Sequence, residues 1–391
     1  MAGNSPERVQ QTEDRQVRQR LAVFYALFFA LVGCNAPYWG PYLQSLGFSY
    51  EDIGSAIACF SLVRIIAPTL WAHWSHHFHT PIHMARIAGI ATAVCFSAIW
   101  LVDGFWPVLA VMLSYGFFWS AMLPQYEVIT MKAIANNLEH YSRIRLWGSV
   151  GFIATVTGLG MMFDHFGVGV LPLVMLILMI GVIVNSWGIR LQTDFKDPVA
   201  SRASLWPVLK QPVVIAFLLL NTLLQMSHGP LYSFFSIYLD DYGYSATEVG
   251  LFWGLGVAAE VVLFWKIRWL LDYGSLRFWL IVSLLITTVR WMAVATLADS
   301  LLVLLLAQLS HAFTFAMLHA VCIRYVPVLF PADLQGKGQA LYSSAGFGLG
   351  GAIGAWLSGY FWAYGGEWVF WAAALVALLA TLIAWRWGPS E

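Results

Sequence analysis

The chain has 391 residues, of which 60% are hydrophobic and only 10% are charged, and its formal net charge is zero. Soluble domains carry about 25% charged and 45–50% apolar residues, so a water-soluble fold of this length could not bury the apolar excess. A neutral chain also offers no basic field for nucleic acid, and we expect none as a partner. The composition predicts an integral membrane protein in a lipid bilayer.

Residues 1–20 are polar and of mixed charge, without the apolar core of a cleavable signal, and we expect them to be a disordered cytoplasmic tail. A bilayer core of roughly 30 Å then needs about 20 apolar residues per helix. The sequence predicts an all-α membrane protein, because twelve such runs follow: 21–45, 53–74, 84–102, 106–131, 145–163, 168–189, 212–239, 249–271, 278–298, 300–325, 338–361 and 367–387.

Basic and acidic residues fall on opposite sides of these runs. With residues 1–20 inside, Arg64 and Arg290 lie within helices, and the other lysines and arginines lie at inner segments or helix ends. The predicted outer loops carry acids instead, namely Glu51, Asp52, Asp103, Asp164, Asp240, Asp241, Glu248, Asp299 and Glu367. By the positive-inside rule, both the first tail and the last, residues 388–391, are expected in the cytoplasm.

The two halves of the chain resemble each other. The segment YLQSLGFS at 42–49 aligns with YLDDYGYS at 238–245, an offset of 196, and LWGSVGF at 146–152 aligns with LYSSAGF at 341–347. The longest inner loop, 190–211, separates them and is expected to be a linker. Two six-helix bundles, 21–189 and 212–387, arranged as parallel repeats are the architecture of the major facilitator fold, with substrate sites near the midplane.

Charged residues inside predicted spans mark the candidate functional site, because a charge at the bilayer centre costs several kcal/mol. Arg64 lies about halfway along its helix, and the repeat offset places Glu260 at the matching position of the second half. We interpret the pair as a cavity-lining base and acid. The alternative is that each charge is neutralised separately within its own half.

Three further residues lie near mid-depth in the second half. Arg290 lies in helix nine, and His311 and His319, eight residues apart on roughly one face of helix ten, could form a proton relay, since imidazole titrates near neutral pH. Glu127 and Arg145, 18 residues apart across a short inner loop, can meet as a substrate-binding pair. The alternatives are hydrogen-bonded packing for the histidines and a surface ion pair for Glu127 and Arg145.

Aromatic residues supply the remaining candidates. Tyr38 and Trp147 could stack on a planar ligand, although ordinary packing is the alternative for each. The four cysteines lie in apolar runs without a CxxC pair, and the histidines at 73–79 have irregular spacing, so we expect no disulfide and no metal. HExxH, GxSxG and GxxxxGK[ST] are absent, which argues against an enzyme, and we expect no cofactor.

Several motifs together resemble the phenylpropionate permease family, a proton-linked branch of the major facilitator superfamily. They are RLWGS at 145–149, AE at 259–260, VRW at 289–291, and the pattern of His311, Thr314, Phe315, His319, Arg324 and Tyr325 in helix ten. The likeness covers about 20–387. It implies a bacterial inner-membrane protein that imports a small aromatic carboxylate with protons.

The chain is more distantly similar to lactose permease. Glu127 and Arg145 match the sugar-binding pair of that protein, and Glu260, Arg290 and His311 also match, but Thr314 stands where the family has its proton-carrying Glu. Glu260 or His319 would then carry the proton, with His311 as part of the relay. The inner loop at 71–79 also departs from the usual G-x-x-x-D-R-x-G-R pattern.

The sequence thus predicts a monomeric, proton-coupled symporter driven by the proton gradient. Arg64, Arg290 or Arg145 would bind a substrate carboxylate, because the guanidinium suits planar, bidentate recognition. A sugar or nucleoside symporter and a drug or metabolite exporter of the same fold stay open as alternatives. A channel is disfavoured because no short filter-like loop interrupts the helices.

Overall fold

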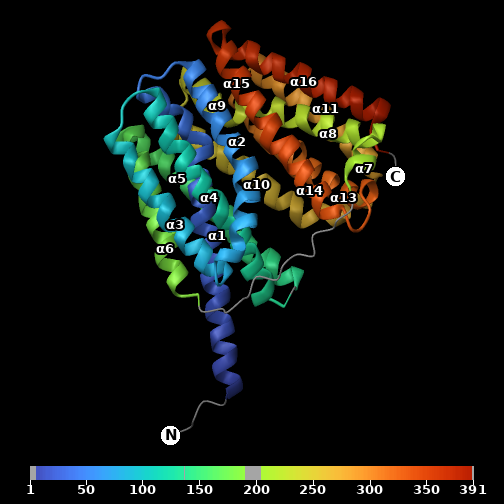
Figure 1. Cartoon of the computed structure of the whole chain (residues 1–391). Coiled ribbons are helices and arrows are strands. Elements are labelled where there is room, and N and C mark those ends of the chain that lie inside the picture. Colours follow the sequence, from blue (N-terminus) through green and yellow to red (C-terminus); the bar gives the residue numbers. More distant parts are fainter. Residues whose placement is uncertain (1–5, 136, 190–203, 390–391) are drawn as a thin grey trace. The chain divides into compact units, whose positions relative to one another are not determined.

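The computed structural model describes residues 6–135, 137–189 and 204–389, and within these the chain is helical and has no strand. This confirms the all-α prediction. The first half contains α1 (Pro6–Ser45), α2 (Tyr50–Trp74), α3 (Pro81–Ser97), α4 (Phe105–Ala133), α5 (Leu138–Phe166) and α6 (Leu171–Trp187), with short 3-10 turns η1 (Ser75–His77), η2 (Ala98–Leu101) and η3 (Val168–Val170) (Figure 1).

The second half has more, shorter elements because several of its helices are interrupted. It contains α7 (Trp206–Leu209), α8 (Pro212–Ser227), α9 (Gly229–Asp241), α10 (Ala246–Leu271), α11 (Leu276–Thr296), α12 (Leu301–Leu309), η4 (Ala312–Met317), α13 (Leu318–Leu329), α14 (Gln335–Ser343), η5 (Ser344–Gly350), α15 (Gly351–Phe361), η6 (Trp362–Tyr364) and α16 (Gly366–Trp387). Of these, η4 and η5 are π-helical turns and η6 is a 3-10 turn.

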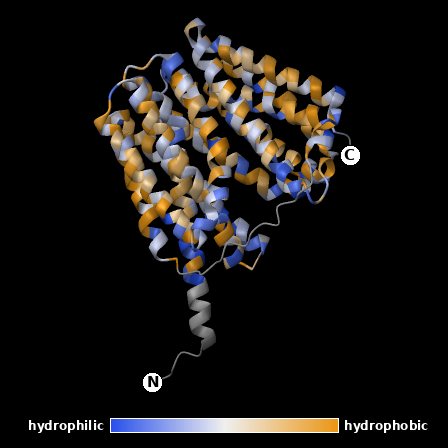
Figure 2. Ribbon diagram, viewed as in Figure 1, coloured by the Kyte–Doolittle hydropathy of each residue, from blue (hydrophilic) through white to orange (hydrophobic). Residues whose placement is uncertain are grey.

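Eleven helical segments of the described chain are long and apolar enough to cross a membrane. The predicted span at 338–361 is also continuous helix, through α14, η5 and α15, but its many glycines and serines lower its hydropathy. Figure 2 shows hydrophobic residues along most of each helix and more hydrophilic residues near helix ends. The segment 6–20 is helical as the start of α1, so the prediction of a disordered tail is wrong there. Glu, Gln and Arg are strong helix formers, and they extend a helix that the membrane segment already nucleates.

By its contacts the chain divides into two compact units. The amino-terminal unit is Met1–Asn35, Val63–Val156 and Gly169–Asp197, and the carboxy-terminal unit is Ala36–Leu62, Thr157–Val168 and Pro198–Glu391. In the amino-terminal unit α3 packs against α4 and α6. Arg86 of α3 donates to the carbonyl oxygens of Ser186 and Ile189 at the end of α6, at 2.8 and 3.0 Å, which satisfies carbonyls that a helix end leaves free.

The core of the carboxy-terminal unit lies where α16 packs against α8 and α11, which lie side by side in Figure 1. Phe217, Leu284 and Leu318 are fully buried there. The α8 helix also packs on the π-helical turn η5, and the Thr222 hydroxyl donates to the Ala345 carbonyl at 3.1 Å. A π-helical turn leaves a carbonyl without its usual i+4 partner, so this bond stabilises the interruption.

The ends of α2 and α5 that belong to the carboxy-terminal unit make close backbone contacts. A Cβ at Gly54 would lie 2.7 Å from the Ala355 carbonyl oxygen and from the Cα of Gly359, and a Cβ at Gly160 would lie 2.4 Å from the Ala246 carbonyl oxygen. Asp164, on the same end of α5, accepts from the Ala246 backbone N–H at 2.9 Å, at the start of α10. Only glycine permits the approach that brings this carboxylate to the helix N-terminus.

Candidate functional site

A row of buried polar side chains crosses three helices of the carboxy-terminal unit. Arg290 of α11 and His311, which follows α12, are 3% and 6% exposed. The Arg290 Nη1 is 2.8 Å from His311 Nδ1, and His311 Nε2 is 2.9 Å from Glu260 Oε1 on α10. The structure therefore brings Glu260, Arg290 and His311 together, with the imidazole between the carboxyl and the guanidinium.

Two more side chains complete the hydrogen bonds of Arg290. Its Nη1 also donates to Thr314 Oγ1 at 2.9 Å, and its Nη2 donates to Gln308 Oε1 at 3.1 Å. Its guanidinium lies 4.4 Å from the centre of the Trp291 ring, and its Nε is buried without a partner among the described residues. Thr314 thus serves as an acceptor for Arg290.

The direction of these hydrogen bonds fixes the tautomer of His311. A guanidinium has five N–H donors and no acceptor, so the Nδ1 that faces Arg290 carries a lone pair. The ring proton of the neutral imidazole is then on Nε2, from which it is donated to Glu260. The row therefore reads, in order, cation, neutral imidazole and carboxyl.

The π-helical turn η4 begins directly after His311 and changes the rotational register between α12 and α13. In a regular α-helix, two side chains eight positions apart point about 80° away from each other around the helix axis. A π turn inserts one extra residue between them and reduces this angle to about 20°. With this π turn between them, His311 and His319, eight positions apart, lie close to one face of the helix. His319 is nevertheless engaged elsewhere, because its Nδ1 is 2.9 Å from the Tyr342 hydroxyl of α14.

His228 occupies a break within the predicted span 212–239. Gly229 and Pro230 interrupt the helix, since proline cannot donate and clashes with the preceding turn. His228 is fully buried, its Nδ1 is 2.9 Å from the Leu224 carbonyl oxygen, and its ring centre lies 6.3 Å from that of His311. Neither His228 nor Gln308 was among the candidate site residues of the sequence, and the Gly229-Pro230 pair was the available signal for the break.

The amino-terminal unit holds the second predicted pair. Glu127 of α4 and Arg145 of α5 interact electrostatically, and Tyr141 interacts with both. The Arg145 guanidinium also lies 3.9 Å from the centre of the Phe29 ring and 5.5 Å from that of Tyr25. Glu127 and Arg145 are therefore brought near each other within a set of aromatic rings, and Tyr141 is a member that the sequence did not suggest.

The remaining predicted residues are more scattered. Arg64 is exposed on α2 and lies near Tyr115, whose hydroxyl accepts from Asn35 at 2.9 Å. Trp147 is 52% exposed in the amino-terminal unit. Tyr38 is buried in the carboxy-terminal unit against Phe163, with ring centres 4.9 Å apart. Their roles in substrate binding stay predictions, as does the pairing of Arg64 with Glu260 across the repeats.

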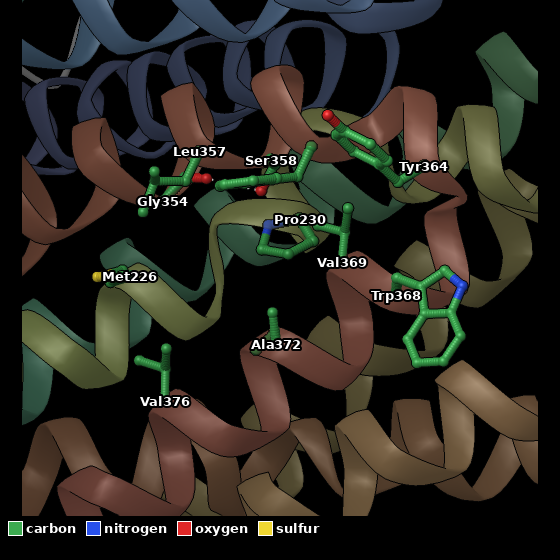
Figure 3. Close-up of a pocket in the computed structure, with 12 residues that line it drawn as sticks. Met226, Pro230, Gly354, Leu357, Ser358, Tyr364, Trp368, Val369, Ala372 and Val376 are labelled. Carbon is green, nitrogen blue, oxygen red and sulfur yellow. Dashed lines mark hydrogen bonds between the residues drawn. The ribbon is translucent and has the colours of Figure 1, made fainter.

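No group of three or more His, Cys, Asp or Glu side chains among the described residues could hold a metal ion. A cavity of about 280 Å³ lies between α8, α9, α15 and α16, and its wall is almost entirely apolar (Figure 3). Its polar side-chain groups are the Ser358 and Tyr364 hydroxyls and the Trp368 indole N–H, and the Ser358 hydroxyl already donates to the Gly354 carbonyl oxygen at 2.6 Å. No charged side chain of the described chain lines this cavity, so it does not suit a charged ligand.

The chain matches the model described as "MFS_1 like family" over residues 19–372. It is 30% identical over 384 residues to a probable 3-phenylpropionic acid transporter of Escherichia coli, covering 95% of this chain and 98% of the relative. It is 24% identical to a maltose permease of Geobacillus stearothermophilus, covering 92% and 93% of the two chains.

Two solved structures share the fold at low sequence identity. The nucleoside transporter NupG aligns with a TM-score of 0.83 at 14% identity, covering 95% of this chain and 99% of the other. A bacterial homologue of the human lysosomal transporter Spinster aligns with a TM-score of 0.76 at 15% identity, covering 98% of both chains. These similarities confirm the predicted major facilitator fold and the resemblance to phenylpropionate permeases.

Proposed function

The chain belongs to the MFS_1-like family and is a multi-pass membrane transporter, and from that premise we propose that it is a proton-coupled symporter that imports a small aromatic carboxylate. The observation that carries this proposal is the buried row of Arg290, His311 and Glu260. It offers a cation for a carboxylate beside two groups that can bind a proton. The relative described as a 3-phenylpropionic acid transporter suggests 3-phenylpropionate as the first substrate to test.

In this proposal the transporter works by alternating access, as expected of two parallel repeats. Binding of a proton by the Glu260 and His311 pair would compensate the charge of the substrate, which lowers the electrostatic cost of moving it through a low-dielectric interior. Glu127 and Arg145 would supply a second polar contact for the substrate. We further propose a bacterial inner-membrane location with both termini in the cytoplasm, supported by the distribution of lysine and arginine.

One observation favours a sugar or nucleoside as the alternative substrate. The interacting set of Glu127, Arg145 and Tyr141 combines a carboxylate, a guanidinium and a hydroxyl, which suits several hydroxyl groups better than one carboxylate. The maltose permease relative is consistent with this alternative.

Uptake into proteoliposomes tests both possibilities. Purified protein would be supplied with radiolabelled 3-phenylpropionate, maltose or uridine, with and without an inward proton gradient. We expect 3-phenylpropionate to accumulate only with the gradient. If only maltose or uridine were taken up with the gradient, that compound would be the substrate in place of 3-phenylpropionate. Accumulation of 3-phenylpropionate that does not depend on the gradient would contradict proton coupling.

A further inference from the structure

The hydrogen bond between Arg290 and His311 occupies the one atom of the imidazole that could accept a proton. His311 Nε2 already carries its proton and donates it to Glu260 at 2.9 Å, while Nδ1 accepts from Arg290 Nη1 at 2.8 Å. Protonation of the ring therefore requires the guanidinium to move away from Nδ1. Proton binding at His311 and the Arg290 contact exclude each other.

Charge balance adds a second constraint on when the guanidinium can move. With Glu260 ionised, the row carries one positive and one negative charge. A proton added to Glu260 would leave the buried Arg290 without a counter-charge, which is costly in a site this enclosed. A proton can therefore join the row without penalty only if a new negative charge arrives with it.

The charged and titratable groups around His311, among the described residues of its unit, fit this balance. Glu260 of α10 is the acid, Arg290 of α11 is the base, and His228 lies between α8 and α9 with its Nδ1 bonded to the Leu224 carbonyl. His319, in α13, is hydrogen-bonded to the Tyr342 hydroxyl. Tyr232 of α9 interacts electrostatically with Arg290 and is a neutral phenol. Glu260 is thus the one acidic side chain in the set, so an imidazolium at His311 needs a second anion to offset Arg290.

We propose that a substrate carboxylate draws Arg290 away from His311, and that the co-transported proton then binds at the Nδ1 that Arg290 has left. In this step the Arg290–Nδ1 hydrogen bond breaks, a carboxylate–guanidinium contact forms, and a proton from water adds to the Nδ1 lone pair. The imidazolium keeps its Nε2 hydrogen bond to Glu260. The row then holds two positive and two negative charges, so one monoanionic carboxylate moves with one proton and no net charge. This inference rests on the proposed function.

The tautomer of His311 tests the starting state without any substrate. In protein labelled with ¹⁵N-histidine at neutral pH, NMR should show His311 as the neutral Nε2–H form, with its signal identified by loss in His311→Gln. Because this measurement uses no ligand, it separates failure of the inference from failure of the proposed substrate. A His311 signal of the Nδ1–H form, or of imidazolium in ligand-free protein, would overturn the inference whatever the protein transports.

Binding of 3-phenylpropionate tests the exchange itself. By calorimetry in buffers of different ionisation enthalpy, we expect one proton to be taken up with each bound anion, and affinity should fall about tenfold for each unit of pH rise. In His311→Gln the proton uptake and the pH slope should both vanish, whereas His165→Gln, at the exposed end of α5, should match the unmodified protein. Proton uptake that survives in folded His311→Gln would refute Nδ1 as the proton site.

Discussion

Replacing Glu260 with Gln removes one negative charge from the buried row while keeping the shape of the side chain. The amide oxygen can still accept from His311 Nε2, which lies 2.9 Å from Glu260 Oε1. The charge of Arg290, which is 3% exposed, then has no counter-charge within the row. Leaving one buried charge unpaired costs about 3–5 kcal/mol, and we expect the lower value because Arg290 keeps three acceptors.

The consequence for transport follows from the energy of the proton gradient. One pH unit supplies about 1.4 kcal/mol for each proton, which is enough for about tenfold accumulation by a one-to-one symporter. Without the Glu260 carboxylate, an imidazolium at His311 together with Arg290 would face only the single negative charge of the substrate, so Glu260→Gln should bind no proton with the substrate and show no accumulation above equilibrium. It should retain exchange of labelled for unlabelled substrate between preloaded vesicles, because exchange does not require the empty carrier to reset.

Two comparisons make this experiment decisive. Glu51→Gln, an exposed acid at the start of α2, is the matched control and should accumulate substrate as the unmodified protein does. The double variant Glu260→Gln with Arg290→Gln should regain thermal stability, since no buried charge remains, but should not accumulate substrate. Uphill accumulation by Glu260→Gln at the unmodified level would refute the reasoning, because proton binding would then not depend on the Glu260 carboxylate.

Three further predictions concern other parts of the chain. Arg145→Ala or Glu127→Gln should abolish uptake while the protein stays in the membrane, and normal uptake by either variant would remove the pair from the binding site. Asp164→Ala should lower the free energy of unfolding by about 1 kcal/mol, the usual value of a helix N-terminal cap, because it removes the acceptor of the Ala246 N–H; an unchanged thermal midpoint would contradict this. Reporter fusions in the 190–211 linker should read cytoplasm, and fusions at Asp299 should read the outside; a reversal at either site would break the predicted topology.

The sequence alone was sufficient for the membrane fold. Each span must satisfy its own backbone hydrogen bonds in lipid, so long apolar runs already specify helices, and most predicted spans match a continuous helical segment. The sequence also singled out Glu260, Arg290 and His311 as candidates, through their depth within the predicted spans and through the family resemblance. The same reasoning placed Glu127 near Arg145 across a short loop.

Only the tertiary structure decided which side chains bond within those helices. The partners of Arg290 include Gln308 and Thr314, and His319 bonds Tyr342 rather than the row. Such choices depend on the rotation of each helix about its axis, which a single π turn after His311 changes by about 100°. The apolar pattern of the sequence fixes how deep a residue lies in the membrane, but packing between helices far apart in the chain fixes the direction in which its side chain points.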